Sequence, residues 1–135
     1  MDIGEETDIY IPRIYWTNSS DKLAILRLNR LQNYLELMIS DTKSGKSKTI
    51  ITDTDSCWID IDEIKAMFLR KEDSIIWVTE RSGYRHAYLY DYNGNLINPV
   101  TSGDWEITSV EGISEKDGLV YFYGKKDSHL EQHIY

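Results

Sequence analysis

The sequence predicts an all-β fold, and three observations support this prediction. Short segments either alternate between apolar and polar residues or are rich in β-branched and aromatic side chains. Turn signals built from Gly, Asn, Asp and Ser separate these segments. No window of helical length shows a clean 3.6-residue apolar period. The best rival is 26–39, but its flanking turns and the alternating run YLELMIS at 34–40 argue against a helix.

Strands are expected over most of the chain. The expected segments are 23–30, 34–40, 48–52, 64–69, 74–79, 86–91 and 119–123. Turn signals lie between them at 18–21, 43–46, 71–74, 81–83, 92–95 and 115–118. Asn93-Gly94 is the sharpest of these signals, because both residues tolerate the positive φ of a tight hairpin turn. We therefore expect residues 75–79 and 86–91 to pair as antiparallel strands.

Two markers recur along the chain. A turn precedes an apolar strand at 20–23, 73–76 and 117–120. In addition, 54–61 (TDSCWIDI) resembles 101–108 (TSGDWEIT), since each carries a Trp followed closely by an Ile. A period in the forties to low fifties with four short strands is typical of a β-propeller blade. The sequence therefore predicts a fragment of a β-propeller, with about two complete four-stranded antiparallel blades plus part of a third.

The expected blades occupy residues 10–53, 64–101 and 106–135, after an N-terminal extension of residues 1–9. Closed propellers typically contain ~4–8 blades, so fewer than three would leave apolar blade faces open. Two arrangements would cover these faces. The chain could be part of a larger propeller, or it could associate with copies of itself as a homo-oligomer.

Composition limits the class of partner. The formal net charge is −8, and an acidic surface repels phosphate backbones, which argues against nucleic acid. No stretch approaches the ~18 apolar residues of a membrane span, so we expect no membrane insertion. The N-terminal segment lacks the basic and apolar regions of a signal peptide. Cys57 is the one cysteine, which excludes an internal disulfide.

The motifs of common catalytic and metal centres are missing, so we expect no catalytic residue, cofactor or metal in this chain. There is no Gly-x-Ser-x-Gly elbow and no Gly-rich phosphate loop. His129 and His133 share a strand face, but no third ligand completes a recognisable site. The acidic run 53–63 lacks the Gly and Glu that a calcium-binding EF-hand loop requires.

Two polar segments allow a functional interpretation beside a structural one. Glu80, Arg81 and His86 could form an acid–base set, but adjacent residues on a strand point to opposite faces. A structural ion pair of Glu80 and Arg81 at a strand end is therefore preferred. For residues 53–63 the preferred interpretation is a solvated loop between blades with Trp58 buried beneath it. The second interpretation is a loop that faces substrate.

Three segments resemble, in family order, the propeller of the dipeptidyl peptidase IV family. Residues 10–17 (YIPRIYWT) followed by 28–33 (LNRLQN) resemble its Trp-bearing strand and Leu-Gln-Asn segment. Residues 77–91 resemble its Trp-x-Ser-Glu-Arg-Asp-Gly…His-Leu-Tyr-Leu-Tyr-Asp blade, with Thr79 and Ser82 as departures. Residues 101–107 resemble its Thr-x-Gly-x-Trp-Glu-Val strand, and the similarity spans residues 10–135.

The resemblance implies a parent protein with an eight-bladed propeller and an α/β-hydrolase domain. Members of the family are exported serine peptidases that remove N-terminal dipeptides, preferring Pro or Ala second. Their Ser-His-Asp triad lies in the hydrolase domain, and their paired Glu residues lie in an Asp-Trp-Val-Tyr-Glu-Glu-type segment that this sequence lacks. The resemblance thus implies a non-catalytic segment with a structural and substrate-gating role. A small stand-alone, self-associating binding module is the alternative.

The resemblance also marks one loop. In some relatives the loop after the Trp that matches Trp58 reaches toward the substrate and carries an aromatic residue and an Arg. The corresponding segment here is Ile59-Asp60-Ile61-Asp62-Glu63. The candidate substrate-approaching residues are therefore Trp58, Asp60, Asp62 and Glu63.

Overall fold

The computed structural model describes residues 2–71 and 73–135, and these contain strands and turns but no helix, which confirms the all-β prediction. The first sheet contains β1 (Ile9–Trp16), β2 (Lys22–Asn29), β3 (Tyr34–Asp41) and β4 (Ser47–Thr54). The second contains β5 (Lys65–Phe68), β6 (Ser74–Thr79), β7 (His86–Asp91) and β8 (Leu96–Pro99). The third contains β9 (Ile107–Ser114), β10 (Leu119–Gly124) and β11 (His133–Ile134).

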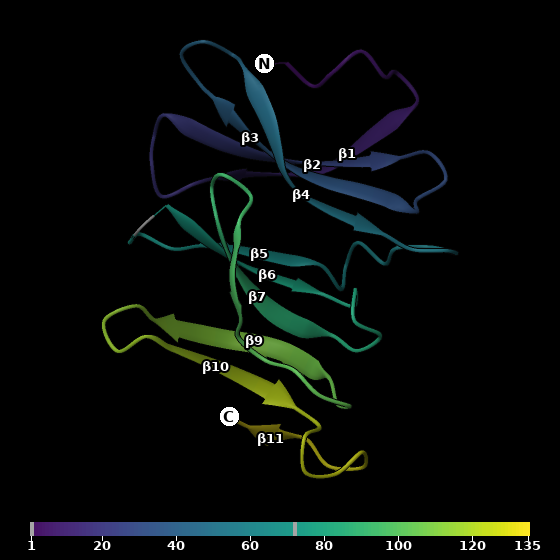
Figure 1. The fold of residues 1–135 in the computed structure, drawn as a ribbon, viewed down its shortest axis with the longest axis vertical. Coiled ribbons are helices and arrows are strands. Elements are labelled where there is room, and N and C mark those ends of the chain that lie inside the picture. The colour runs from purple at the N-terminus through teal and green to yellow at the C-terminus, as the bar shows by residue number, and fades with distance from the viewer. Residues whose placement is uncertain (1, 72) are drawn as a thin grey trace.

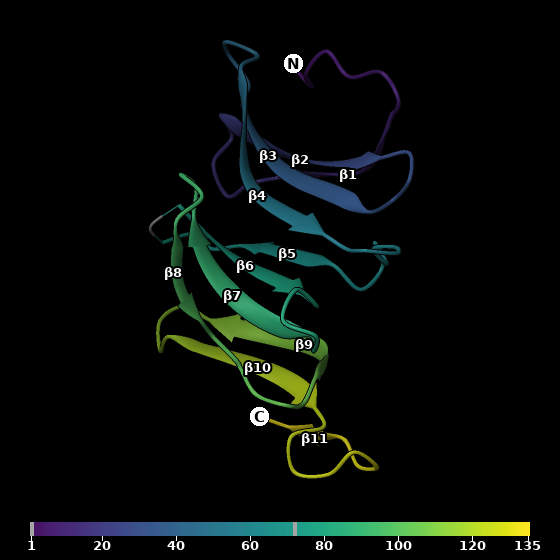
Figure 2. The same cartoon turned by 45° about the vertical axis from the view of Figure 1, so that its right-hand side comes forward.

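Each sheet is an antiparallel meander. In all three sheets, strands that are consecutive in the chain are neighbours in space: β1-β2-β3-β4, β5-β6-β7-β8 and β9-β10-β11. The sheets follow one another along the long axis, with the N-terminus at the first and the C-terminus at the third (Figures 1 and 2). The predicted pairing of 75–79 with 86–91 is confirmed, because β6 pairs antiparallel with β7 from Ser74–Asp91 to Thr79–His86.

The seven expected segments correspond to β2–β7 and β10, and four further strands lie outside them. β1 contains Pro12 and has a register irregularity between Tyr10 and Arg13. β8 is short and exposed and ends at Pro99. Both pair with a single neighbour, where a missing N–H is tolerated. Edge strands of this kind carry a weak apolar pattern, because little of their surface is buried.

β6 lies between two hydrophobic layers. Ile75 and Trp77 belong to the core between the first and second sheets, whereas Ile76 and Val78 belong to the core between the second and third sheets. All six residues of β6 are buried as a result. Successive side chains point to opposite faces, so a strand covered on both faces reads as a continuous apolar run instead of an alternating one.

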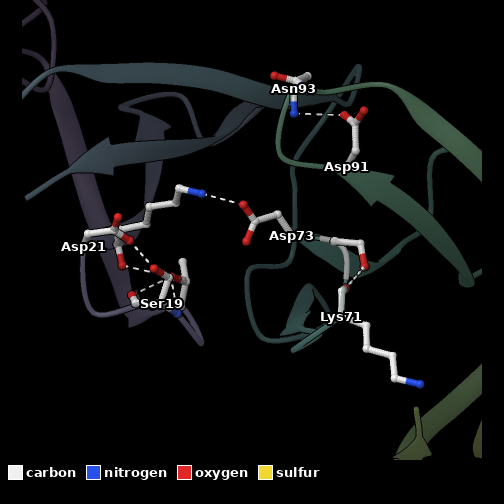
Figure 3. Close-up of polar contacts among 9 residues, drawn as sticks. Ser19, Asp21, Lys71, Asp73, Asp91 and Asn93 are labelled. Atoms are coloured by element: carbon white, nitrogen blue, oxygen red, sulfur yellow. Dashed lines mark hydrogen bonds and ion pairs between the residues drawn. The ribbon is translucent and has the colours of Figure 1, made fainter. Parts of the chain in front are cut away.

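The first and second sheets also contact each other through polar side chains at one end of their strands. Lys22 Nζ lies 2.5 Å from Asp73 Oδ2, and Figure 3 shows Asp73 turned toward this ammonium group. Nearby, Lys48 Nζ donates to the carbonyl of Asn93 at 3.1 Å. Because these groups are exposed or partly exposed, the ion pair and the hydrogen bond add little stability and serve mainly to orient the two edges.

The turn after β7 differs from the predicted tight hairpin. Gly94 has a φ of 92°, but Asn93 is not among the described residues with positive φ. Asp91 organises the turn: its Oδ1 accepts the N–H of Asn93 at 2.9 Å (Figure 3). The same oxygen accepts the N–H of Asn95 at 2.8 Å. A three-residue turn with one left-handed glycine therefore replaces the two-residue turn that Asn93-Gly94 suggested.

We predict that Ile75→Ala lowers the free energy of unfolding by about 2–5 kcal/mol, since it opens a cavity between two sheets. Ile75 is completely buried, whereas Ile97 on β8 is 51% exposed. Ile97→Ala is the matched control and should change stability by no more than about 0.5 kcal/mol. Urea denaturation measures both variants. Equal effects of the two substitutions would contradict the assignment of the core.

We also predict that Asn95→Ala raises the pKa of Asp91 toward its ordinary value. Hydrogen bonds from the side chain and backbone of Asn95 hold the pKa of Asp91 below that value. A lowered pKa means that the carboxylate stabilises the turn at neutral pH and that this contribution is lost as the pH falls through the lowered pKa. A carboxyl ¹³C titration by NMR measures the pKa. The pKa of Asp41, lowered mainly by hydrogen bonds from Ser44, should not move.

Candidate functional site

Residues 55–63, which form most of the loop between β4 and β5, make one side of a small pocket. The hairpin between β6 and β7 forms the other side. The pocket has a volume of about 230 Å³. Its lining residues are Asp53, Thr54, Asp55, Trp58, Ile59, Asp60, Glu63, Ile64, Thr79, Glu80, Arg81 and Gly83.

Trp58 is exposed at the rim of this pocket, and the prediction that it is buried under the loop is wrong. Its side chain is 54% exposed, whereas that of Ile59 is only 8% exposed and belongs to the core between the first two sheets. Adjacent residues of an extended chain point to opposite sides, so burying Ile59 turns Trp58 outward. The indole is nevertheless fixed, because its Nε1 donates a hydrogen bond to Gln32 Oε1.

Trp105, the recurring partner of Trp58 in the sequence, has a different environment. It is partly buried and packs against His86 at 5.1 Å and Phe122 at 5.8 Å between ring centroids. The buried isoleucine after it, Ile107, is two residues away instead of one. In an extended chain that spacing places both side chains on the same face. The shared sequence marker therefore corresponds to a core tryptophan in one case and an exposed one in the other.

The three acidic candidates lie in different places. Asp60 lines the pocket, and its Oδ1 accepts the N–H of Asp62 at 3.0 Å. Glu63 also lines the pocket and forms an ion pair with Arg85. Asp62 does not line the pocket; its exposed carboxylate lies 2.7 Å from Arg13. The structure thus brings Trp58, Asp60 and Glu63 together and separates Asp62 from them.

A buried polar cluster closes the inner side of the pocket, and sequence reasoning missed it. Asp53 is 5% exposed and accepts a hydrogen bond from Trp77 Nε1 at 2.7 Å and another from the guanidinium of Arg81. The expected pair of Glu80 with Arg81 is wrong: Arg81 binds Asp53, and Glu80 lies 3.9 Å from Arg85. Asp53, the partner of Arg81, is 28 residues away and lies on another sheet, so no local sequence pattern could predict this pair.

Two tyrosines complete this cluster. The guanidinium of Arg81 lies 5.5 Å from the ring centroids of both Tyr88 and Tyr90, a cation–π geometry, and it also donates to the Tyr90 hydroxyl. Burial raises the pKa of Tyr90, while the nearby charge of Arg81 acts against this rise. The hydroxyl of Tyr90 therefore stays neutral and accepts the hydrogen bond at physiological pH.

The histidines do not gather into a centre. His86 is buried, with Nδ1 3.0 Å from Thr101 Oγ1 and Nε2 2.9 Å from the carbonyl of Gly103. His133 lies 3.4 Å from Glu131 in an exposed segment. Over residues 2–71 and 73–135, no three His, Cys, Asp or Glu side chains come together in a way that could hold a metal ion. The same residues contain no helix long and apolar enough to cross a membrane.

Comparison with known proteins shows similarity over the whole chain. The family described as "Dipeptidyl peptidase IV (DPP IV) N-terminal region" matches residues 1–135. Among solved structures, the dipeptidyl peptidase 4 of Porphyromonas gingivalis superposes with a TM-score of 0.87 and 31% identity, covering 99% of this chain and 19% of that one. The partial-propeller prediction is thereby confirmed.

Curated fungal proteins show the same relation. A protein of Aspergillus flavus named "Probable dipeptidyl peptidase 4" is 32% identical over 145 residues, which cover 100% of this chain and 18% of that protein. A protein of Emericella nidulans with the same name is 27% identical, and the match covers 100% of this chain and 19% of that protein. The chain thus spans about a fifth of the length of these relatives. It belongs to the family of dipeptidyl peptidase IV N-terminal regions, and by itself it is a segment of the propeller.

Proposed function

We propose that this chain is a non-catalytic propeller segment of a longer serine-type dipeptidyl peptidase, which removes N-terminal dipeptides, typically with Pro or Ala second. The observation that carries this proposal is the match of all three sheets to a dipeptidyl peptidase 4 structure of which they form 19%. The names of the relatives support the activity of the parent protein. An exported location is part of the proposal and rests on the family resemblance.

The partners that we propose are the remaining blades and the α/β-hydrolase domain of the parent chain. Within this chain, residues 1–9 serve as an extension and residues 10–53, 64–101 and 106–135 serve as blades. The outer faces of the first and third sheets support this division. Ile14 and Trp16 pair with Ile25 and Leu23 on the face opposite the core and are exposed, as are Leu119 and Tyr121 on β10. Neighbouring blades would cover these four side chains.

The role of the segment is to wall the cavity of the parent protein and to help position short peptides, with the loop 55–63 facing substrate. An exposed but hydrogen-bonded tryptophan beside a pocket supports this role, since an indole offers a large apolar surface at low entropic cost. Asp62 lies outside the pocket lining and pairs with Arg13, so in this proposal it holds the loop instead of contacting a ligand.

The second candidate function is a self-associating binding module, and the exposed apolar faces favour it. Static light scattering at several protein concentrations distinguishes a propeller segment that stays monomeric from a self-associating module. A stable monomer that does not bind a hydrophobic dye rules out self-association. A concentration-dependent dimer that is abolished by Trp16→Glu supports it.

We predict that the purified 135-residue chain does not hydrolyse a Gly-Pro chromogenic reporter. The reason is that its sequence has no Gly-x-Ser-x-Gly nucleophile elbow and no Asp-Trp-Val-Tyr-Glu-Glu-type segment. Release of chromophore is measured with and without a serine-directed inhibitor. Inhibitor-sensitive turnover by the pure chain would overturn the non-catalytic assignment.

We predict that, in a longer protein that contains this chain, Trp58→Ala raises KM for dipeptidyl substrates by about 5–30-fold with a smaller change in kcat. The expected size corresponds to the loss of one well-placed aromatic contact, roughly 1–2 kcal/mol. Leu130, which is almost fully exposed on the third sheet's C-terminal loop, provides the control Leu130→Ala. Identical kinetic constants in the two variants would remove loop 55–63 from the substrate path.

A further inference from the structure

We propose that Gln32 is a positioning residue that holds Trp58 at the rim of the pocket; this inference rests on the proposed substrate-facing role of loop 55–63. Gln32 lies in the turn between β2 and β3, inside the LNRLQN segment at 28–33. Although this segment is a recognisable sequence marker, none of its residues lines the pocket. Gln32 therefore acts on the pocket only through its contacts with loop 55–63.

The backbone of Gln32 is strained. Its φ is 58°, and among the described residues only Asp73 is another non-glycine residue with a positive φ. A left-handed conformation is unfavourable for a residue with a Cβ and persists only where the surroundings impose it. The turn is closed by a hydrogen bond from the N–H of Gln32 to the carbonyl of Asn29 at 3.0 Å.

This conformation lets one residue bind two successive residues of the loop. The carbonyl oxygen of Gln32 accepts the N–H of Ile59 at 2.7 Å, and its side-chain oxygen accepts the indole N–H of Trp58. Ile59 enters the core while Trp58 points outward. Gln32 therefore contacts both the buried residue Ile59, through its backbone, and the exposed indole of Trp58, through its side chain.

The turn that carries Gln32 is fixed by its neighbours. Asn29 Oδ1 accepts hydrogen bonds from the N–H groups of Asn33 and Tyr34, both at 3.0 Å, and Asn29 Nδ2 donates to Asn33 Oδ1 at 2.8 Å. The carbonyl of Asn33 in turn accepts the N–H of Asp55, the first residue of the loop, at 3.0 Å. The turn is thus joined to the loop at both its start and its centre, which makes it a rigid support.

The side-chain contact has a consequence that the backbone contact does not. The bond to Ile59 fixes the path of the loop, whereas the bond to the indole fixes the ring orientation of a side chain that is half exposed. An exposed tryptophan without this bond would sample several rotamers and would lose entropy when it met a ligand. The geometry therefore assigns the side chain of Gln32 to preorganising the ring.

The test uses the four indole N–H signals of the ¹⁵N-labelled 135-residue chain, with Trp58→Phe to assign that of Trp58. In Gln32→Met, which removes the acceptor at similar size, we expect the Trp58 indole proton to exchange with water about three- to tenfold faster, the effect of losing one net hydrogen bond. Gln32→Glu keeps an oxygen acceptor and should restore slow exchange. The Trp77 indole, bonded to buried Asp53, is the internal control for folding and should not change.

A second variant separates the two contacts. Gln32→Gly suits the left-handed φ and keeps the carbonyl that binds Ile59, so the thiol of Cys57 in the same loop should react with a disulfide reagent at the wild-type rate while the Trp58 indole still exchanges faster. Unchanged exchange of the Trp58 indole in Gln32→Met, or an equal change at Trp77, would overturn the proposal. Both readouts are independent of peptidase activity, so a failure of the proposed function is recognised separately, by an unaltered KM in Trp58→Ala.

Discussion

The burial of the second sheet on both of its faces is the constraint on which the rest of the structure depends. β6 sends Ile75 and Trp77 into one core and Ile76 and Val78 into the other. The apolar residues of each sheet are covered by the neighbouring sheet, so the sheets stabilise one another by stacking. The order of the sheets along the chain, and the loops that connect them, follow from this stacking.

The buried pair of Asp53 and Arg81 is the polar counterpart of this stacking. A carboxylate that is 5% exposed requires a partner, and Asp53 obtains two from the second sheet, the guanidinium of Arg81 and the indole N–H of Trp77. Asp53 is the second-last residue of β4, immediately before the loop, while Arg81 lies in the β6–β7 hairpin. The pair therefore sets the distance between the two walls of the pocket, and its value lies more in fixing this geometry than in adding stability.

The strands could be predicted from the sequence because alternation and turn chemistry are local properties: β3, β6 and β7 lie within one residue of their expected bounds. The site could be predicted only in part. Glu80 and Arg81 were neighbours in sequence, but the partner of Arg81 was fixed by sheet stacking. The interpretation with Trp58 buried beneath the loop is wrong because Ile59 enters the core and the adjacent side chain of Trp58 points outward. Gln32 lies in the LNRLQN marker, but its contact with Trp58 could not be predicted, since that contact depends on a backbone conformation that the sequence does not specify.

The acidic residues in and beside the loop are engaged mainly in contacts within the structure, whereas Trp58 is exposed at the rim of the pocket. Asp53 and Glu63 are neutralised by Arg81 and Arg85. Asp55 accepts the N–H groups of Cys57 and Trp58, and Asp60 accepts that of Asp62, so these carboxylates act as local caps. A carboxylate engaged in this way is less available to attract a charged substrate. In the proposed substrate-facing role of the loop, selection would depend on the shape and position of the indole more than on charge.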